Sequence, residues 1–435
     1  MIGSPVGGLS ISNFVAANSV TLATNGSQYA VGYYDNSIDD WTNYTTATVG
    51  SANDFDIGKG YQMGTVSGGT QILAFTGTIS ATDESQSVIN NNAANSGNGR
   101  RWNLVANPYP TYLNANDDTD NTNNFLTTNV SKIDNEFLAI YGWDADGTGY
   151  TARGHDFSSD TPVYLAPGQA FFIASDDVVG ENITFSEAMQ TVSPASSDDF
   201  IQGDAISAKE IYLRIYHDDL FIEDTHIKFQ DNMTLGLDPG YDLGNYDQNA
   251  AISSRLTEED QGTNFAHQQL PLSAMENAVI PIVINQLTGQ EYRLNLHSAT
   301  IPNPNVFLED VQLGTFTNLY EEDVLISADS DLGGAGRFYI HMSSETMSNE
   351  VVSRNLLNAY KKTNDSYITI EGLSSQTGNV TISLFDILGS RVLSTSFDNS
   401  MNKRRISTNL ISSGVYIIEL ESYGHRTTKK ILIQQ

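Results

Sequence analysis

The sequence predicts an all-β protein made of several β-sandwich domains. Short apolar or alternating stretches recur along the whole chain, and Gly, Asn, Asp or Pro turns separate them. Only 17% of the residues are charged, and the polar remainder, mostly Asn, Ser, Thr, Gly and Gln, suits strands joined by turns. Because 435 residues exceed one ordinary core, we expect three parts. These are a repeat-containing β-rich N-terminal region, a jelly-roll-like middle sandwich and an Ig-like C-terminal sandwich.

The predicted strands are short and spread evenly over the chain. They lie at 19–24, 71–79, 101–108, 169–175, 182–188, 210–216, 225–230, 278–285, 291–298, 337–343, 366–372, 379–386 and 414–422. Two short stretches, 273–279 and 348–362, are the only ones with a helix-like pattern.

Two polar junctions divide the chain into domains. The stretch 190–205 is small, polar and acidic, as a linker is. At 343–365 the charge balance changes: residues 350–435 hold ten Lys/Arg against seven Asp/Glu, whereas the rest holds eleven against forty-five. We therefore expect domains at 1–197, 206–345 and 356–435. Any proteolytic cleavage is expected within 343–365, because a protease reaches exposed linkers.

The first domain contains a possible internal repeat. Residues 1–5 and 104–108 share two apolar residues, a small one, Ser or Asn, and Pro, and residues 58–61 match 168–171. We therefore predict two related repeats, the first truncated at Met1, with an upstream region and any signal peptide outside this sequence. Chance similarity of short β motifs is the alternative.

Composition excludes several classes of function. A net charge of −31 argues against nucleic acid or anionic lipid as partner. There is no cysteine, hence no disulfide or thiolate chemistry, and no apolar run approaches the roughly twenty residues that span a bilayer. Neither HExxH nor GxSxG occurs. We expect a protein that is not an enzyme and has no certain cofactor.

Metal binding is a hypothesis for three places. Asp144, Asp146 and Thr148 offer oxygen ligands for Ca²⁺ in a Gly-rich loop, and the acidic stretch 117–124 could do the same. A hairpin at 217–226 could bring His217 and His226 together as transition-metal ligands, beside acids at 218, 219 and 224. Solvated turn residues and strand ends are the alternative at all three.

Aromatic residues in polar stretches suggest a second kind of site. Trp41 and Trp143, with Tyr44, Tyr141 and Tyr150 nearby in sequence, could form a platform on which a glycan stacks. Burial in a core is the alternative, since aromatic side chains in small β-domains usually bury their large apolar area.

The C-terminal part has the pattern of a small sandwich. Val380, Ile382 and Leu384 alternate on one strand, and a turn follows in which Gly389 can take positive φ. Leu410 is expected to act as an apolar plug, and Gly414 as a bend before the next strand.

This part closely resembles the C-terminal A-type sorting domain of type IX secretion substrates in Bacteroidetes. Order, spacing and terminal position all agree, apart from Ser390 between Gly389 and Arg391. The matching residues are Gly378, Val380, Leu384, Phe385, Asp386, Gly389, Arg391, Val392, Leu410, Gly414, Val415, Tyr416, Lys429, Lys430 and Ile431. The resemblance implies an address that the type IX machinery at the outer membrane recognises. Cleavage of the tail and attachment of the passenger to surface lipopolysaccharide then commonly follow.

The upstream blocks resemble surface-protein modules of the same bacteria, with "WNLVANPYP" and "PGQAFFI" in the first. We therefore expect a secreted or cell-surface protein. The hypothesis is an adhesin-like or structural passenger; the alternative is a non-catalytic, carbohydrate-binding accessory region of a larger secreted hydrolase.

Overall fold

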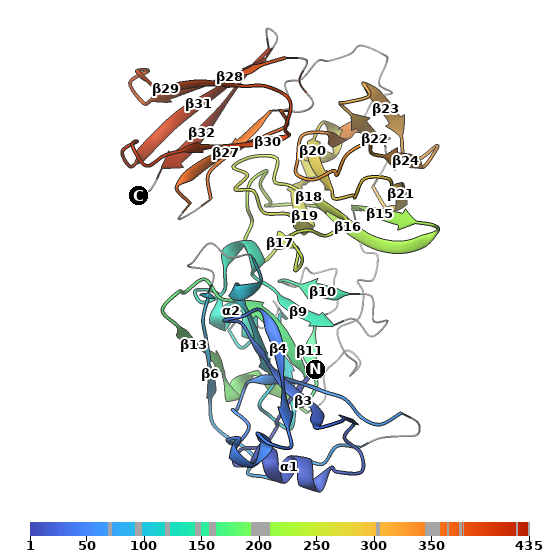
Figure 1. The fold of residues 1–435 in the computed structure, drawn as a ribbon, viewed down its shortest axis with the longest axis vertical. Coiled ribbons are helices and arrows are strands. Elements are labelled where there is room, and N and C mark those ends of the chain that lie inside the picture. Colours follow the sequence, from blue (N-terminus) through green and yellow to red (C-terminus); the bar gives the residue numbers. More distant parts are fainter. Residues whose placement is uncertain are drawn as a thin grey trace. The chain divides into compact units, whose positions relative to one another are not determined.

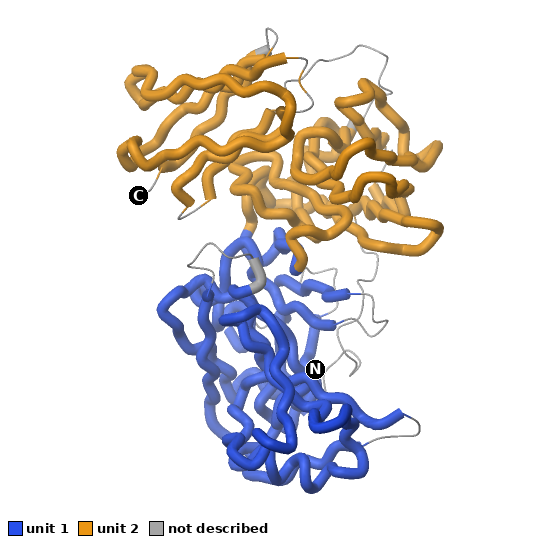
Figure 2. The backbone as a smooth tube through the Cα atoms, viewed as in Figure 1, with its two compact units in different colours: residues 1–207, 239–246 blue, residues 208–238, 247–435 orange. Residues whose placement is uncertain are grey.

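The predicted all-β class is confirmed by a computed structural model, in which about 49% of residues are strand and 8% helix. The structure describes residues 1–67, 72–91, 98–117, 122–143, 149–155, 162–192, 209–301, 305–343, 357–362, 365–373, 376, 378–422 and 425–433. Figure 2 colours two compact units: unit 1 comprises residues 1–207 and 239–246, and unit 2 comprises residues 208–238 and 247–435. Among the described residues, no helix is long and apolar enough to cross a membrane.

Unit 1 is a set of small sheets with two short helices (Figure 1). Its strands pair in the orders β1-β5-β3-β2 with β4 beside β3, β10-β9-β12-β7, β11-β8-β14 and β13-β6. Its elements are β1 (Ile2–Gly3), α1 (Ile11–Ala17), β2 (Thr24–Asn25), β3 (Gln28–Asp35), β4 (Asp40–Thr45), η1 (Val49–Ser51), β5 (Gly60–Met63), β6 (Glu84–Val88), η3 (Asn98–Arg101), β7 (Trp102–Ala106), β8 (Tyr112–Asn114), α2 (Phe125–Asn129), η5 (Asn135–Phe137), β9 (Ile140–Trp143), β10 (Tyr150–Arg153), β11 (Tyr164–Leu165), β12 (Ala170–Ala174), β13 (Glu181–Phe185), η6 (Glu187–Met189), β14 (Gln190–Thr191) and β17 (Leu243–Gly244).

The two stretches that resemble each other in sequence pair in the same register. Gly3 lies opposite Gly60 in the β1–β5 pair, and Ala106 lies opposite Ala170 in the β7–β12 pair. The stretches also exchange hydrogen bonds, since the Gly3 N–H donates to the carbonyl of Gly168 (2.7 Å) and the Ala106 N–H to that of Gly58 (2.8 Å). Both turn glycines have positive φ, +80° at Gly58 and +70° at Gly168. The β1–β5 and β7–β12 strand pairs therefore have equivalent registers, and each donates a hydrogen bond to the other.

Helix α1 was not predicted from the sequence. Ser10 caps it, accepting a hydrogen bond from the Asn13 N–H, and Ile11, Phe14 and Val15 are its buried face. At seven residues it is too short for a strong periodic signal.

The strand expected at 71–79 does not form in the part that the structure describes, apart from one bridge between Thr78 and Gly7. The Asn18 side chain instead accepts from the Ala74 N–H (2.7 Å) and donates to the Ala74 carbonyl (3.0 Å). The Asn18 side chain thus satisfies the two backbone hydrogen-bonding groups of Ala74 that a neighbouring strand would otherwise satisfy.

Residues 239–246 belong to unit 1, although the sequence placed them in the middle domain. The Tyr246 ring stacks on Trp102 (4.5 Å between centroids) and on Tyr150 (4.1 Å). The Tyr141 hydroxyl donates to the Gly244 carbonyl (2.7 Å). These contacts fill the core around β7, β9 and β12, so unit 1 depends on a distant segment of chain.

The first part of unit 2 is a large sheet that surrounds one apolar core. Its strands follow the order β23-β22-β25-β20-β18-β19-β16-β15-β21-β24, and β16 and β19 are parallel. A short η7 helix forms in the helix-like stretch at 273–279. The elements are β15 (Glu210–His217), β16 (Leu220–Gln230), β18 (Ile252–Ser254), β19 (Phe265–Pro271), η7 (Leu272–Glu276), β20 (Val279–Ile284), β21 (Glu291–Ala299), β22 (Asn305–Asp310), β23 (Thr315–Asn318), β24 (Val324–Ser327) and β25 (Phe338–Ser343).

The second part of unit 2 is a two-sheet sandwich with its own core (Figure 1). One sheet has the order β26-β27-β30 and the other β29-β28-β31-β32. Its strands are β26 (Asn358–Tyr360), β27 (Tyr367–Glu371), β28 (Val380–Asp386), β29 (Arg391–Phe397), β30 (Lys403–Ser407), β31 (Gly414–Ser422) and β32 (His425–Ile433). Residues 358–360 form a strand, not part of the helix that 348–362 suggested, because they pair with β27.

The expected plug at Leu410 is wrong. Leu410 is fully exposed, and the neighbouring Ile411 is the buried residue. The Ile411 N–H donates to the Thr408 carbonyl (2.9 Å) and closes a turn. In this turn the buried side chain is that of Ile411. The alternation of Val380, Ile382 and Leu384 is confirmed, since all three are buried.

A Cβ at Gly3 should weaken the contact between the β1–β5 and β7–β12 strand pairs of unit 1. It would overlap the Ala106 Cβ and lie 2.7 Å from the Lys59 carbonyl oxygen. We expect Gly3→Ala to destabilise unit 1 by roughly 1–3 kcal/mol, as overpacking does. Thermal and urea unfolding of the full chain measure this. Gly50→Ala is the control, because no atom lies within 4 Å of its Cβ position. Equal losses of unfolding free energy in the two variants would contradict the close contact at Gly3.

Candidate functional site

The residues of the tail pattern separate into a buried set and an exposed set. The buried set builds the sandwich core and comprises Val380, Leu384, Tyr416 and Ile431. Between β28 and β29 the Asp386 carboxylate accepts from the N–H groups of Leu388 (2.9 Å) and Ser390 (2.8 Å). Gly389 has φ +84°, which confirms the predicted turn.

Two residues of the tail pattern, Phe385 and Val415, form an apolar strip with Ile417 and Leu432 on the outer face of the β29-β28-β31-β32 sheet. Phe385 lies opposite Ile417, and Val415 lies opposite Leu432. Val415, Ile417 and Leu432 are exposed, and Phe385 is half-buried. Arg391 and Lys430 stand at the two ends of the Phe385–Ile417 row. We call these four apolar residues the outer strip; an exposed apolar strip between cations is a surface that a protein partner can cover.

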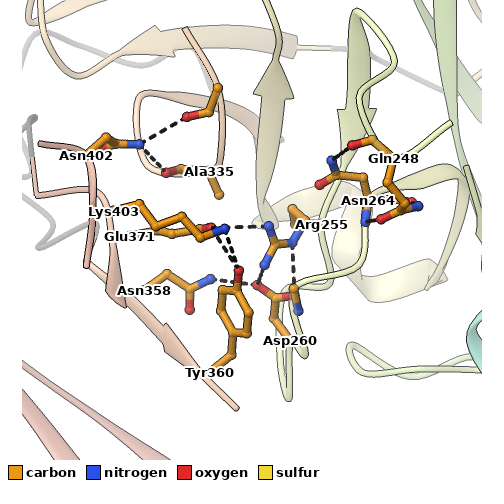
Figure 3. Close-up of polar contacts among 12 residues, drawn as sticks. Gln248, Arg255, Asp260, Asn264, Ala335, Asn358, Tyr360, Glu371, Asn402 and Lys403 are labelled. Carbon is orange, nitrogen blue, oxygen red and sulfur yellow. Dashed lines mark hydrogen bonds and ion pairs between the residues drawn. The ribbon is translucent and has the colours of Figure 1, made fainter. Parts of the chain in front are cut away.

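Arg255, just after β18, is the centre of a buried charge network within unit 2 (Figure 3). Its guanidinium donates through two nitrogens to both carboxylate oxygens of Asp260, at 3.0 and 2.7 Å, and through a third nitrogen to Glu371 at 3.3 Å. All three side chains are at least 98% buried. Asp260 comes from the loop between β18 and β19, whereas Glu371 ends β27 in the C-terminal sandwich. The network therefore joins the two parts of unit 2.

The sandwich supplies a row of polar residues across its β26-β27-β30 sheet. Asn358, Glu371 and Lys403 are cross-strand neighbours in this sheet. Lys403 pairs with Glu371 (2.7 Å), and Asn358 donates to Asp260 (2.6 Å). The Tyr360 hydroxyl donates to Glu371 (2.8 Å), and its ring lies 4.9 Å from the Arg255 guanidinium carbon. Each buried charge thus has a partner of opposite sign.

The two lysines of the tail pattern also lie at this junction. Lys429 donates to the side-chain oxygen of Asn358, and burial lowers the pKa of its ammonium group. Lys430 lies 3.6 Å from Glu259, and both of these side chains are largely exposed. Lys429 therefore contributes to the junction, whereas Lys430 remains at the surface.

Opposing effects set the protonation of the network. Burial favours the neutral form of Glu371, but Arg255 and Lys403 outweigh it and lower the pKa of this carboxyl below its ordinary 4.5. Burial acts against the charge of Arg255 too, yet Asp260 and Glu371 raise its pKa. Glu371 is therefore ionised at neutral pH. No pattern in the sequence indicated this network, because Arg255 and Glu371 are 116 residues apart.

The two tryptophans proposed to bind a glycan both lie on one aromatic cluster of unit 1. Trp41 contacts Tyr34 (5.7 Å between centroids) and Phe172 (6.2 Å). Trp143 contacts Tyr150 (5.0 Å), which in turn contacts Phe172 (5.5 Å). Trp143 is 46% exposed, and Trp41, Tyr34 and Tyr150 are half-buried. We call these five residues the aromatic cluster.

Two other tyrosines of that hypothesis do not belong to the cluster. Tyr141 is fully buried, and burial raises the pKa of its hydroxyl. Tyr44 packs on Tyr33, with 5.8 Å between ring centroids, over the separate core beneath α1. The side chains of Tyr141 and Tyr44 therefore pack in the hydrophobic cores of unit 1.

The proposed metal ligands are not assembled where the structure describes them. Asp144, Asp146 and Thr148 lie outside the described residues. Of the stretch 117–124, Asp117 accepts from the Tyr164 hydroxyl (2.9 Å) and Asn124 caps α2. Across the described part of the chain, no group of three or more His, Asp or Glu residues could hold a metal ion.

The hairpin of β15 and β16 separates the two histidines proposed as ligands. His226 lies opposite Tyr212, and His217 lies opposite Leu220. Roughly five residues of strand, about 16 Å, divide the two positions. His226 stacks instead on His267, with 4.3 Å between ring centroids. The hairpin therefore does not bring His217 and His226 together, and the hypothesis of a transition-metal site at this pair is wrong.

Comparison with known families agrees with the tail's geometry. Residues 363–434 match the family described as the secretion system C-terminal sorting domain. The chain is a type IX secretion substrate, exported to the cell surface or the extracellular space, and the secretion machinery is its partner. It belongs to the family described as "Domain of unknown function (DUF8693)", which matches residues 1–342. No curated protein matches the chain.

The pKa of Glu371 gives the junction a specific pH dependence. A carboxyl whose folded pKa lies below its unfolded value stabilises the fold above the unfolded value, and this contribution is lost as the pH falls through the folded pKa. We expect Glu371→Gln to lower the midpoint of thermal unfolding at pH 7, with a difference from wild type that persists to about pH 5 and shrinks below it. Thermal scans of the full chain from about pH 7 to about pH 3 measure this. The exposed Glu322 provides the control, Glu322→Gln; a wild-type difference that grows in acid would contradict the assignment.

Proposed function

We propose that residues 1–342 are a non-enzymatic, adhesin-like passenger that the sorting domain carries out of the cell. Export to the outside is the established part, and it puts the passenger where surface binding is useful. The aromatic cluster is the observation that carries the binding proposal. Its Trp143 is exposed while its other members pack on the core of β7, β9 and β12, so the exposed ring is held on a rigid support.

A glycan is the ligand class that this surface favours. The apolar faces of sugar rings stack on aromatic side chains, and hydroxyl groups need hydrogen-bond acceptors beside them. Asp39 supplies an acceptor near Trp41, since it accepts from the Tyr34 hydroxyl (2.5 Å) and lies in the turn between β3 and β4. Surface lipopolysaccharide, which the tail resemblance implies as an attachment point, would be a separate partner from this ligand.

A second candidate function rests on the same cluster. Residues 1–342 would be a carbohydrate-binding accessory region of a larger secreted hydrolase. They would keep the catalytic domain of that hydrolase close to its polysaccharide substrate. Both candidates require glycan binding; a hydrolytic activity encoded in the same natural chain would favour the second.

Glycan binding should depend on the tryptophans of the cluster. On a panel of immobilised polysaccharides, we expect the full chain to be retained and Trp143→Ala to bind roughly 2- to 10-fold more weakly, the value of one aromatic contact of about 0.5–1.5 kcal/mol. Trp41→Ala should add to the loss. Tyr320→Ala is the control, because Tyr320 is a similarly exposed aromatic residue of unit 2. Retention that survives both tryptophan substitutions would place the ligand elsewhere, and no retention on any glycan would contradict the proposal.

A further inference from the structure

We infer that the loops 255–262 and 333–336 form a docking surface for the chain's own sorting domain, which holds that domain in place after the chain is cut between β25 and β26. The occupant is the sandwich of β26 to β32. The inference concerns this contact alone and does not depend on what residues 1–342 bind.

The charges of the docking surface are completed only by the sorting domain. Arg255 and Asp260 pair with each other, but Arg255 also donates to Glu371 and Asp260 also accepts from Asn358. Lys403 in turn pairs with Glu371. A buried charge that loses its partner strongly destabilises the protein. Separation of the two surfaces therefore costs free energy until water solvates the charges that it exposes.

The shapes of the two surfaces also fit closely at two separate points. At the first, a Cβ on Gly262 would overlap the ring of Tyr360. At the second, a Cβ on Gly336 would overlap the backbone of Gly372. Close backbone approach of this kind needs glycine, and two points of contact set the orientation of the sorting domain as well as its position.

Asn402 adds hydrogen bonds at the second point of contact. Its side-chain amide donates to the carbonyl groups of Gly333 (3.3 Å) and Ala335 (3.4 Å), as Figure 3 shows. The docking surface therefore combines buried ion pairs, close packing and amide–carbonyl bonds, which is the composition of a specific interface.

The contacts named above are made by residues 255–262, 333–336 and 358–403, which lie outside the connection between β25 and β26. Leu357, Asn358 and Ala359 are buried in the sandwich, so a protease that needs an exposed, extended segment does not cut among these three residues. This removes 357–359 from the window of 343–365 that the sequence suggested. A cut before residue 357 removes the covalent link and leaves the docking surface complete.

The docked sorting domain still presents its outer strip. Val415, Ile417 and Leu432 are exposed with the docking surface occupied, whereas the half-buried Lys429 donates to Asn358, which itself donates to Asp260 of the docking surface. A partner that covers the outer strip can therefore bind without displacing the sorting domain.

A site-specific cut in the full chain tests the inference. A protease recognition sequence is inserted within 344–356, the purified protein is cleaved completely, and the two fragments are followed by size-exclusion chromatography and native mass spectrometry. We expect the fragments to migrate together at micromolar concentration, with a Kd below roughly 1 µM. Separation of two fragments that both remain folded by circular dichroism would overturn the inference.

Two substitutions on opposite sides of the contact keep the test specific. Arg255→Met on the docking surface and Glu371→Gln on the sorting domain should each weaken retention of the cut tail by roughly 100-fold or more, because the first leaves the buried Asp260 without its cation and the second removes one of the two carboxylates around the buried Arg255. If Arg255→Met unfolds the module, Glu371→Gln decides the matter alone. Arg293→Met is the matched control, because Arg293 forms an exposed ion pair with Asp323 (2.8 Å) on the same module. Retention unaffected by Glu371→Gln, or weakened as much by Arg293→Met, would overturn the assignment of this surface.

Discussion

The contact of Arg255 with Asp260 and Glu371 is the interaction on which the organisation of unit 2 depends. A guanidinium buried to this extent is stable only with carboxylates on more than one side, and here one carboxylate comes from each part of the unit. The sorting domain is therefore a structural neighbour of the exported module as well as an address.

Unit 1 is organised by close packing of small residues. The paired strands around Gly3 and Ala106 leave no room for larger side chains, and the backbone of β5 at Gly60 lies against Leu104 and Ala170. The core of β7, β9 and β12 supports the aromatic cluster, and Tyr246 of that core comes from the segment 239–246. The family match over residues 1–342 agrees with this, because it treats unit 1 and the sheet of β15 to β25 as one evolutionary unit.

Local patterns in the sequence were sufficient to predict the fold class, the tail and its turn at Gly389, because strand alternation and turn chemistry involve neighbouring residues. Contacts between distant residues were not predictable in this way. Nothing in the spacing of Arg255 and Glu371 indicates that they meet, and nothing local decides which of the apolar neighbours Leu410 and Ile411 points into the core. The strand expected at 71–79 failed for the same reason, since the side chain that satisfies its backbone, Asn18, lies outside the segment. Trp41 and Trp143 were identified by residue type, but only the fold brings them to one cluster.

The central claim is that Arg255 and Glu371 stabilise each other across the junction. A double-mutant cycle on the full chain tests it most directly, with the free energy of unfolding of unit 2 measured for wild type, Arg255→Met, Glu371→Gln and the double variant. The account predicts a coupling energy of about 1–3 kcal/mol, so that the double variant is less destabilised than the sum of the single ones. Additivity within about 0.3 kcal/mol would contradict it, because residues that do not interact contribute independently.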